Sequence, residues 1–502
     1  LLKAGITPEA LHLIPGKGAD IGQTLVSDPR IAGVCFTGST ATAQTINKAI
    51  ADNADSDAIL IAETGGLNAM IIDSSALPEQ VVRDVVASAF QSAGQRCSAL
   101  RVLFVQKDVE EKVINMICGA MDQLSINDPS LLRTDVGPVI DQKALSIINN
   151  HCQNMESQGK LIKKLEVPAE LTGSFAAPTL IRLNSIDELQ QEIFGPVLHV
   201  VSYDVNDFDA VTDSINKTGY GLTFGVHSRI DGRVQKIVDA VNVGNYYVNR
   251  NQIGAVVGSQ PFGGHGLSGT GPKAGGPLYL RKFRQSSEVA QAVTETANTK
   301  AVNIHEINNA ILQLEATKYA DKEKRTALVR SALKGEAKDA MSAAVALDMT
   351  SVELPGPTGE SNQYHLEARG LVLCLGESPE ALLAQTTQAL VTGNKVVAVL
   401  GYQCKETEAA FKRLAKADLP VVLIHGTLDF STLAEVKALD LVALNTQEDK
   451  LKQVKQALCS RSGAIVSVIS DILYPGAYVH EKTVSTDTTA AGGNAQLLAE
   501  MS

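Results

Sequence analysis

A cysteine and a glutamate stand where they could perform acyl-transfer chemistry. Cys97 follows a predicted helix in the segment Gly94-Gln95-Arg96-Cys97-Ser98, so its thiol can sit on a turn rather than in a core. Glu63 follows an apolar run, and a carboxylate at a strand end points into the crevice where open α/β sheets bind ligands. Oxidising an aldehyde needs a nucleophile that makes the carbonyl carbon tetrahedral and a base that hydrolyses the acyl-enzyme. A thiol and a carboxylate suit these two tasks.

Both residues also have an ordinary structural interpretation. A lone cysteine is more often a small buried thiol, and Glu63 could be a helix cap or a solvated turn residue. The seven cysteines are scattered and show no paired metal-ligand spacing, so no metal site is predicted: Cys35, Cys97, Cys118, Cys152, Cys374, Cys404 and Cys459. The choice between the two interpretations therefore needs further motifs.

The elements around these residues alternate between apolar runs and helical patterns. Strands are predicted at residues 10–14, 33–36 and 58–61, with helices at 21–26, 42–50 and 78–93. This alternation indicates an α/β fold that begins with a βαβ series of nucleotide-binding type. A second βαβ series is predicted after residue 370, with strands at 370–376 and 395–400.

The chain divides into four predicted segments. Residues 1–67 form half of a nucleotide-binding domain, 68–283 a catalytic α/β domain, 284–309 a polar linker and 310–502 a second, non-catalytic domain. Residues 414–458 repeat the order of elements seen in residues 2–50, which suggests a degenerate duplicate.

The duplicate has lost the residues that could do chemistry. Leu444-Asn445-Thr446-Gln447 stands where the first copy has Phe36-Thr37-Gly38-Ser39-Thr40, and no second Gly-Gln-Arg-Cys segment follows. We therefore expect the second copy to be structural.

Composition excludes several classes of function. Lys and Arg total 44 against 55 Asp and Glu, a net charge of -11 with no basic run, which argues against nucleic-acid binding. No apolar stretch approaches the ~20 residues needed to cross a bilayer, and unpaired cysteines suit a reducing cytoplasm. We expect a small-molecule substrate and a cytoplasmic location, with membrane association only through domains outside these residues.

Five motifs in order resemble those of the aldehyde dehydrogenase superfamily and cover about residues 1–283. They are Phe36-Thr37-Gly38-Ser39-Thr40, Glu63-Thr64-Gly65-Gly66, Gly94-Gln95-Arg96-Cys97, Glu192-Ile193-Phe194-Gly195-Pro196-Val197, and Pro261-Phe262-Gly263-Gly264 with Gly266-Leu267-Ser268-Gly269. The resemblance implies that Cys97 attacks the aldehyde, that hydride passes to a nicotinamide, and that Glu63 activates the water that cleaves the thioester.

The same resemblance implies NAD as the cofactor and five residues that contact it. Gly38 and Ser39 would lie beside the pyrophosphate at a helix N-terminus, Glu192 at the nicotinamide ribose and Phe194 near the nicotinamide, with Gly65 also in the site. Glu192 and Phe194 could instead be a solvated charge and a core ring. The choice between NAD and NADP stays open.

Two later segments are similar to those of glutamate semialdehyde dehydrogenases. They are residues 249–258 and Gly271-Pro272-Lys273-Ala274-Gly275-Gly276-Pro277. The implied substrate is L-glutamate γ-semialdehyde, whose α-carboxylate would be held by Ser98, Gly264 and His265. For His265 we expect mainly a backbone contribution, and a partly exposed loop histidine is the alternative.

Residues 485–495 resemble the tail of long-form proline utilization A proteins, which are bifunctional. That resemblance implies an upstream proline dehydrogenase that would carry FAD, an internal channel, a homo-oligomer, and a C-terminal domain that acts as a lid or in assembly. An exposed flexible tail over residues 483–495 is the alternative. The resemblance also implies that the first half of the NAD-binding domain precedes residue 1. The remaining alternatives are another aldehyde as substrate or an inactive scaffold fragment.

Overall fold

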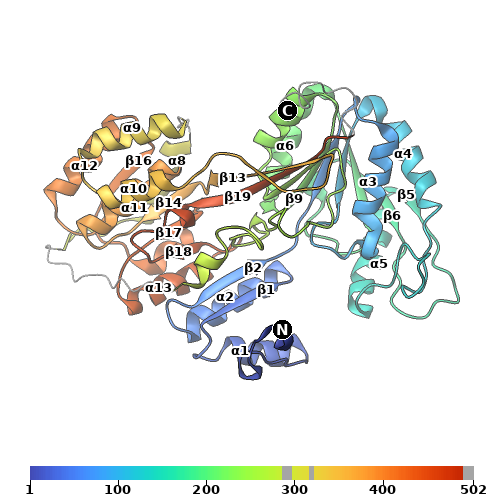
Figure 1. Ribbon diagram of the computed structural model, residues 1–502, viewed down its shortest axis with the longest axis horizontal. Helices are drawn as coiled ribbons and strands as arrows, with labels where there is room; N and C mark the ends of the chain where they lie inside the picture. The colour runs from blue at the N-terminus through green and yellow to red at the C-terminus, as the bar shows by residue number, and fades with distance from the viewer. Residues whose placement is uncertain (285–296, 316–320, 490–502) are drawn as a thin grey trace.

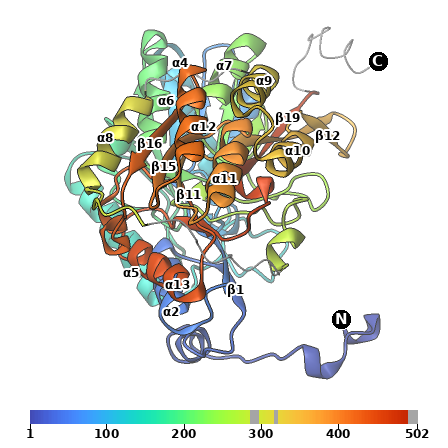
Figure 2. The same cartoon turned by 90° about the vertical axis from the view of Figure 1, so that its left-hand side faces the viewer.

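The computed structural model describes residues 1–284, 297–315 and 321–489. Figure 1 shows two α/β lobes joined by a long pair of strands, with the N-terminal unit packed below the junction. Figure 2 shows the first residues of the chain extending away from both lobes. The α/β fold class predicted from the sequence is confirmed.

The N-terminal unit is a two-stranded parallel sheet with one covering helix. Strand β1 (Gly33–Thr37) pairs with β2 (Ile59–Glu63), and α2 (Thr40–Asn53) connects them, as the sequence predicted. Helix α1 (Gln23–Val26) follows a π-helical turn at Gly18–Gly22. The short 3-10 helices of this unit span Leu2–Ala4 and Pro8–Ala10.

The strand predicted at residues 10–14 is wrong. The chain leaves its 3-10 helix at Leu11 without entering a β-ladder, and Leu13 is 90 % exposed. An apolar run becomes a strand only where a neighbouring strand can take its backbone hydrogen bonds. In the structure no described strand lies beside this run.

A ten-stranded sheet forms the centre of the larger lobe. In spatial order its strands are β12 (Val352–Leu354), β13 (Glu360–Ala368), β19 (Val479–Asp487), β10 (Asn245–Val248), β9 (Thr223–His227), β3 (Ala69–Ile72), β4 (Val102–Gln106), β7 (Val197–Tyr203), β6 (Thr179–Leu183) and β5 (Leu161–Lys164). The strands from β19 to β6 are parallel, and the flanking pairs are antiparallel. Buried parallel strands explain the continuous apolar runs in the sequence.

Five helices cover this sheet, and two small β-strands sit at its end. The helices are α3 (Pro78–Phe90), α4 (Lys107–Met121), α5 (Gln142–Ser157), α6 (Phe208–Lys217) and α7 (Asp231–Ala240); the strands are β8 (Tyr220–Gly221) and β11 (His265–Gly266). Helix α3 stops three residues before the predicted end, because the chain turns into a 3-10 segment (Gln91–Gly94).

The smaller lobe contains a five-stranded parallel sheet of dinucleotide-binding topology. Its order is β16 (Val421–His425), β15 (Lys395–Leu400), β14 (Leu371–Cys374), β17 (Leu441–Ala443) and β18 (Ser467–Ile469). Counted along the chain this order is 3-2-1-4-5, which matches five of the six strands of the classic doubly wound order 3-2-1-4-5-6. Its helices are α8 (Ile304–Glu315), α9 (Lys322–Leu333), α10 (Lys338–Ala346), α11 (Pro379–Val391), α12 (Lys405–Lys416) and α13 (Glu448–Cys459).

The predicted linker overlaps this lobe. Helix α8 begins at Ile304, inside the interval 284–309, and residues 285–296 lie outside the described residues. The strands predicted at 370–376 and 395–400 are confirmed as β14 and β15. The domain boundaries themselves stay a prediction.

Strands from the C-terminal part of the chain complete the larger sheet. β19 lies between β10 and β13, with Thr483 opposite Asn245 on one side and Tyr364 on the other. The flexible-tail alternative is therefore wrong for residues 483–487, and residues 490–495 lie outside the described residues. This pairing brings C-terminal side chains next to the loops that follow β10 and β2.

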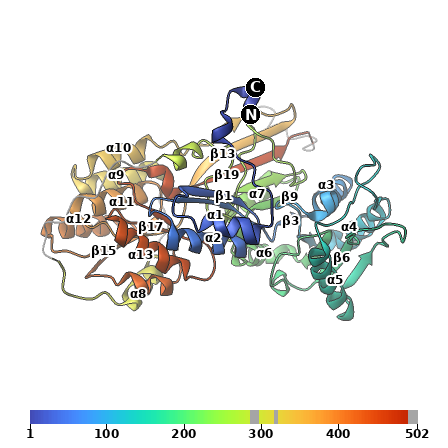
Figure 3. The ribbon, with the colours of Figure 1, turned by 90° about the horizontal axis from the view of Figure 1, so that it is seen from below.

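Corresponding helices of the two copies predicted from the sequence pack together. Helix α13 lies beside α2 (Figure 3), and Asn47 on α2 donates a hydrogen bond to the sulfur of Cys459 on α13. Ser39 caps α2 by accepting the Thr42 N–H, whereas α13 begins at Gln447 without a side-chain cap. The second copy therefore lacks a side-chain cap at this helix, and its predicted loss of chemistry stays a prediction.

Within the three described ranges, every helix is too short or too polar to cross a membrane.

The place of β19 in the sheet generates the first testable prediction. Thr483→Pro removes an N–H that donates to the Gly244 carbonyl and should lower the free energy of unfolding by about 3 kcal/mol. Thr483→Val keeps this hydrogen bond between the strands and should lower the free energy of unfolding by less. Urea unfolding of the three proteins measures the difference, and equal midpoints for Pro and Val would show that β19 is not an inner strand.

Candidate active site

The segment before Cys97 forms a tight left-handed turn. Ser92, Ala93 and Gly94 have successive φ values of 56°, 53° and 64°, a conformation that L residues rarely adopt. A Cβ on Gly94 would lie 2.1 Å from the Gly195 carbonyl oxygen, so only glycine fits there. This turn ends α3 and carries the thiol away from the helix into the site.

Arg101 holds this turn from behind. Its guanidinium is buried and donates to the carbonyls of Gly94, at 2.7 Å, and Gly195, at 3.2 Å. It also donates twice to Glu192 Oε1, at 2.8 and 3.1 Å. One buried cation therefore fixes both the Cys97 turn and the Glu192 loop.

Asn68 connects the Glu63 loop to the Cys97 loop. Its side-chain amide donates to the carbonyls of Cys97, at 2.6 Å, and Ala99, at 2.9 Å, while its oxygen accepts the Thr223 N–H. The residue is 2 % exposed, and these bonds satisfy its amide in the interior. The relative position of the two predicted catalytic residues depends on this side chain.

Glu63 ends β2 and is partly buried. Its backbone forms an antiparallel bridge with Gly269, and Oε2 accepts the Gly264 N–H at 3.1 Å. Its other oxygen, Oε1, is buried without a hydrogen-bond partner in the described part of the chain. Burial raises the pKa of this carboxyl to about 8, against the lowering effects of the Gly264 N–H and the nearby Lys273 charge. A carboxylate with a free, desolvated oxygen is suited to take a proton from water.

Cys97 is partly exposed and close enough to Glu63 to be affected by its charge. Burial, then Glu63 and Glu192, raise the pKa of the thiol, and the backbone N–H groups of Ser98 and Cys97 lower it. The same N–H groups can stabilise a developing oxyanion on a carbonyl attached to the sulfur. The structure thus brings together the two residues that the sequence singled out.

Of the residues predicted to bind the cofactor, Gly38 and Ser39 lie at the start of α2, and the other three lie on the loops after β2 and before β7. Gly38 and Ser39 are exposed at the N-terminus of this 14-residue helix, where unpaired N–H groups favour phosphate. A Cβ on Gly65 would lie 1.9 Å from Glu192 Oε2, so Gly65 leaves the space that this carboxylate fills. Phe194 is 42 % exposed and is therefore not a core ring. These residues fit the pyrophosphate and nicotinamide end of a dinucleotide.

Glu192 is neither free nor solvated. Besides its bonds to Arg101, it accepts the Gly66 N–H at 3.2 Å. The alternative of a solvated charge is therefore wrong. Its second oxygen remains beside Gly65, where a ribose hydroxyl could reach it.

The residues predicted to hold the substrate carboxylate are more buried than expected. Ser98 is 4 % exposed, and the Gly264 N–H is occupied by Glu63. His265 is 8 % exposed and stacks on His480 with ring centroids 4.6 Å apart, so the partly exposed loop histidine is wrong. Burial lowers the pKa of His265 to about 4, which keeps the ring neutral.

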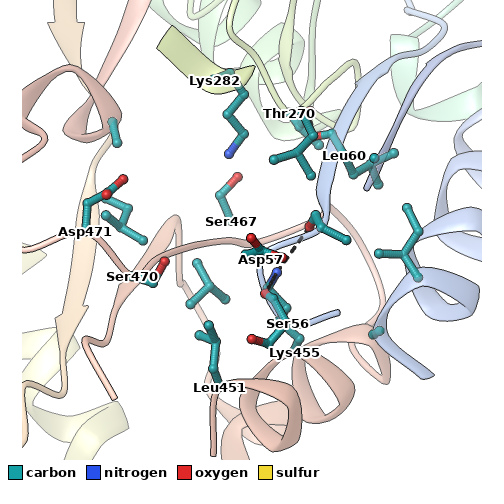
Figure 4. Close-up of a pocket in the computed structure, with 18 of the residues that line it drawn as sticks. Ser56, Asp57, Leu60, Thr270, Lys282, Leu451, Lys455, Ser467, Ser470 and Asp471 are labelled. Atoms are coloured by element: carbon teal, nitrogen blue, oxygen red, sulfur yellow. Dashed lines mark hydrogen bonds between the residues drawn. The ribbon is translucent and has the colours of Figure 1, made fainter. Parts of the chain in front are cut away.

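A cavity of about 710 Å³ lies apart from this site. It is lined by β1, β2, α13 and the edge of the C-terminal sheet, and none of the predicted site residues lines it. Figure 4 shows Lys282, Lys455, Asp57 and Asp471 around it. Its position along β1 makes it a feature of the interface between the N-terminal unit and the smaller lobe.

Sequence reasoning missed Arg101 and Asn68. Both lie within four or five residues of a predicted catalytic residue, and a polar residue next to an apolar strand was the only available signal. Their partners are far away in sequence, so the sequence could not identify their contacts.

Loss of Arg101 should be costly to the fold. Arg101→Met leaves the Glu192 carboxylate buried without its cation and should lower the free energy of unfolding by about 3–5 kcal/mol. The control Arg96→Met removes a guanidinium that is less buried and that, among the described residues, donates to the Ser92 hydroxyl alone. This change should alter the free energy of unfolding by at most about 0.5 kcal/mol. If thermal or urea unfolding showed equal losses of unfolding free energy in Arg101→Met and Arg96→Met, this account of Arg101 would be contradicted.

The comparisons with known proteins agree with this geometry. The profile of the aldehyde dehydrogenase family matches residues 1–289. The bifunctional protein PutA of Salmonella typhimurium is 42 % identical over 99 % of this chain, which spans 38 % of that relative's length. A Thermus 1-pyrroline-5-carboxylate dehydrogenase solved with bound NAD is 35 % identical, with a TM-score of 0.51 over 56 % of this chain and 55 % of the Thermus chain.

A further solved structure covers the C-terminal lobe as well. Proline utilization A from Corynebacterium freiburgense superposes on 97 % of this chain and 45 % of its own, with a TM-score of 0.61 at 23 % identity, which indicates a shared fold. The family profile matches more than half of the residues of this chain, and the structure brings the Cys97 and Glu63 motifs into one site. The chain therefore belongs to the aldehyde dehydrogenase family.

Proposed function

We propose that this chain oxidises L-glutamate γ-semialdehyde, the open form of 1-pyrroline-5-carboxylate, to L-glutamate with NAD. The observation that carries the proposal is Oε1 of Glu63, which is buried, has no hydrogen-bond partner among the described residues and lies near the loop that presents Cys97. The similar Thermus enzyme is named 1-pyrroline-5-carboxylate dehydrogenase, after this activity. In the longer relatives, this step would follow a flavin-dependent proline dehydrogenase within one bifunctional protein of proline catabolism.

The first half of the reaction uses Cys97. The thiol releases its proton to solvent as its sulfur attacks the aldehyde carbon, and the oxyanion of the resulting hemithioacetal receives hydrogen bonds from the backbone N–H groups of Cys97 and Ser98. A bound NAD would supply the acceptor for the hydride that leaves this carbon. Collapse of the tetrahedral carbon leaves an acyl group on the sulfur as a thioester.

The second half uses Glu63. Its ionised carboxylate takes a proton from water, and the resulting hydroxide attacks the thioester carbon, so that the C–S bond breaks and glutamate leaves. The charge of Lys273 and the Gly264 N–H favour the ionised form that this step requires. The proton that Glu63 took from water then passes to the departing Cys97 sulfur, which restores the thiol and the ionised carboxylate.

The substrate's amino-acid end is proposed to bind the loop that follows β10. A substrate carboxylate held by Ser98 and the backbone of His265 would lie beside Gly264, whose N–H already donates to Glu63 Oε2.

The cofactor would lie across the start of α2. Gly38 and Ser39 would receive its pyrophosphate, while Gly65, Glu192 and Phe194 would surround the nicotinamide ribose. We further propose a homo-oligomer and a lid or assembly role for the C-terminal lobe. A cytoplasmic location remains our expectation.

The catalytic assignment predicts complete loss of turnover when the thiol is removed. NADH formation from L-glutamate γ-semialdehyde should fall at least about 10³-fold in Cys97→Ala, both for residues 1–502 and for a longer chain that contains them. Cys118→Ala, a matched change on α4, should keep full activity. Faster turnover of propanal or succinic semialdehyde would overturn the substrate, and unaltered activity of Cys97→Ala would overturn the mechanism.

Ester hydrolysis tests Glu63 without the cofactor. p-Nitrophenyl acetate should acylate Cys97, and the later steady rate should rise with pH around a midpoint of about 8, because Glu63 accepts a proton only after losing its own. Glu63→Gln should keep the acylation burst and lose about 10²–10⁴-fold in the steady rate. A steady rate that changes neither with pH nor in Glu63→Gln would exclude Glu63 as the base.

A further inference from the structure

The strand β19 brings a carboxylate from the end of the chain to the catalytic loops. Glu481 lies on β19 and is 6 % exposed. Its Oε2 accepts the backbone N–H of Lys273 at 2.6 Å, and its Oε1 accepts the Tyr364 hydroxyl at 2.9 Å. A Cβ on Gly276 would lie 2.2 Å from Oε1, so the loop closes tightly around this carboxylate.

Lys273 is the buried cation of the same loop. It is 3 % exposed, and its ammonium reaches four oxygen acceptors, one more than it has N–H groups. These acceptors are the carbonyls of Gly244 and Pro261, the side-chain oxygen of Asn245 and the Thr483 hydroxyl. Because Thr483 donates its own proton to Pro261, every partner of Lys273 favours the charged form.

Only the backbone of Gly263 separates this cation's loop from Glu63. A Cβ on Gly263 would lie 2.7 Å from Glu63 Oε1 and 3.2 Å from the Lys273 Cα. Gly263 also donates its N–H to the Asn245 oxygen that Lys273 contacts. The two segments are paired by mutual backbone bonds between Phe262 and Ala274, at 3.0 and 2.9 Å.

Several charged or titratable groups face this region. Around Glu63 they are Lys273, Glu481, Cys97 and Tyr279, and around Lys273 they are also Lys482, His265 and His480. Burial lowers the pKa values of both histidines, so both rings are neutral. The remaining charged groups next to Glu63 are Lys273 and Glu481. Burial lowers the pKa of Lys273 and raises that of Glu481, and the attraction between the two opposes both shifts. A cavity of about 40 Å³ touches Gly264, Lys273 and Glu481, with room for a water molecule.

We propose that Lys273 and Glu481 act as positioning residues for Glu63, so that the strand β19 contributes to hydrolysis of the acyl-enzyme. Glu481 holds the Lys273 loop, and through it the Gly264 N–H that orients Glu63. The Lys273 charge favours the ionised base. The inference rests on the proposed role of Glu63 and adds a role for a strand that lies more than 400 residues further along the chain.

The pH dependence of p-nitrophenyl acetate hydrolysis tests this pair directly. Lys273→Met removes the cation and should move the midpoint of the steady rate upward by about one pH unit, with the acylation burst retained. Glu481→Gln keeps the shape of the side chain. Burial already lowers the pKa of Lys273, so Lys273 becomes neutral without its counter-charge and the midpoint should move upward. The shift should be smaller than in Lys273→Met, because Glu481 itself raises the pKa of Glu63 and this effect is lost as well.

Lys482→Met is the matched control. Lys482 is the next residue on β19, also buried, and its ammonium bonds to Glu367 and the Val238 carbonyl. This variant should not move the midpoint upward. Midpoints in Lys273→Met and Glu481→Gln equal to that of the unaltered protein would overturn the inference, and Glu481→Gln alone decides it if Lys273→Met fails to fold. A steady rate that does not depend on Glu63 in the unaltered protein would instead overturn the proposed function.

Discussion

The arrangement of the site depends on one constraint, the burial of a carboxylate that must ionise. Desolvation disfavours the charged form of Glu63, and an unpaired buried charge is costly. The Gly264 N–H and the Lys273 ammonium offset only part of this cost, so the pKa of the group lies near 8. A base with such a pKa can hold a proton near neutrality and release it without a large barrier.

That constraint explains why so many parts of the chain converge on one loop. Gly263 must lack a side chain because Glu63 and the Lys273 backbone lie on either side of it. Asn68 fixes the distance between the base and the thiol, and Arg101 supports the turn that presents Cys97. The ten-stranded sheet gives these loops a rigid frame, and β19 adds Glu481 to it. The C-terminal part of the chain is therefore structurally inseparable from the catalytic loops.

The sequence predicted the parts of this account that depend on local pattern. Strands β1 and β2, helix α2 and the paired motifs at Cys97 and Glu63 follow from periodicity and from short, ordered signatures. It failed at residues 10–14, where an apolar run has no neighbouring strand among the described residues. The alternative of a flexible tail failed at residues 483–487, where a polar segment becomes an inner strand because β10 and β13 provide partners. The roles of Arg101, Asn68 and Glu481 come from contacts between distant segments, which no single-sequence pattern contains.

The covalent intermediate is the most direct test of the central claim. Mass spectrometry of Glu63→Gln protein after incubation with p-nitrophenyl acetate would show which residue carries the acyl group. The account predicts one acetyl group on the peptide that contains Cys97, persisting because water is no longer activated. An adduct on another cysteine, or a Cys97 peptide that stays unmodified, would contradict the assignment of the nucleophile.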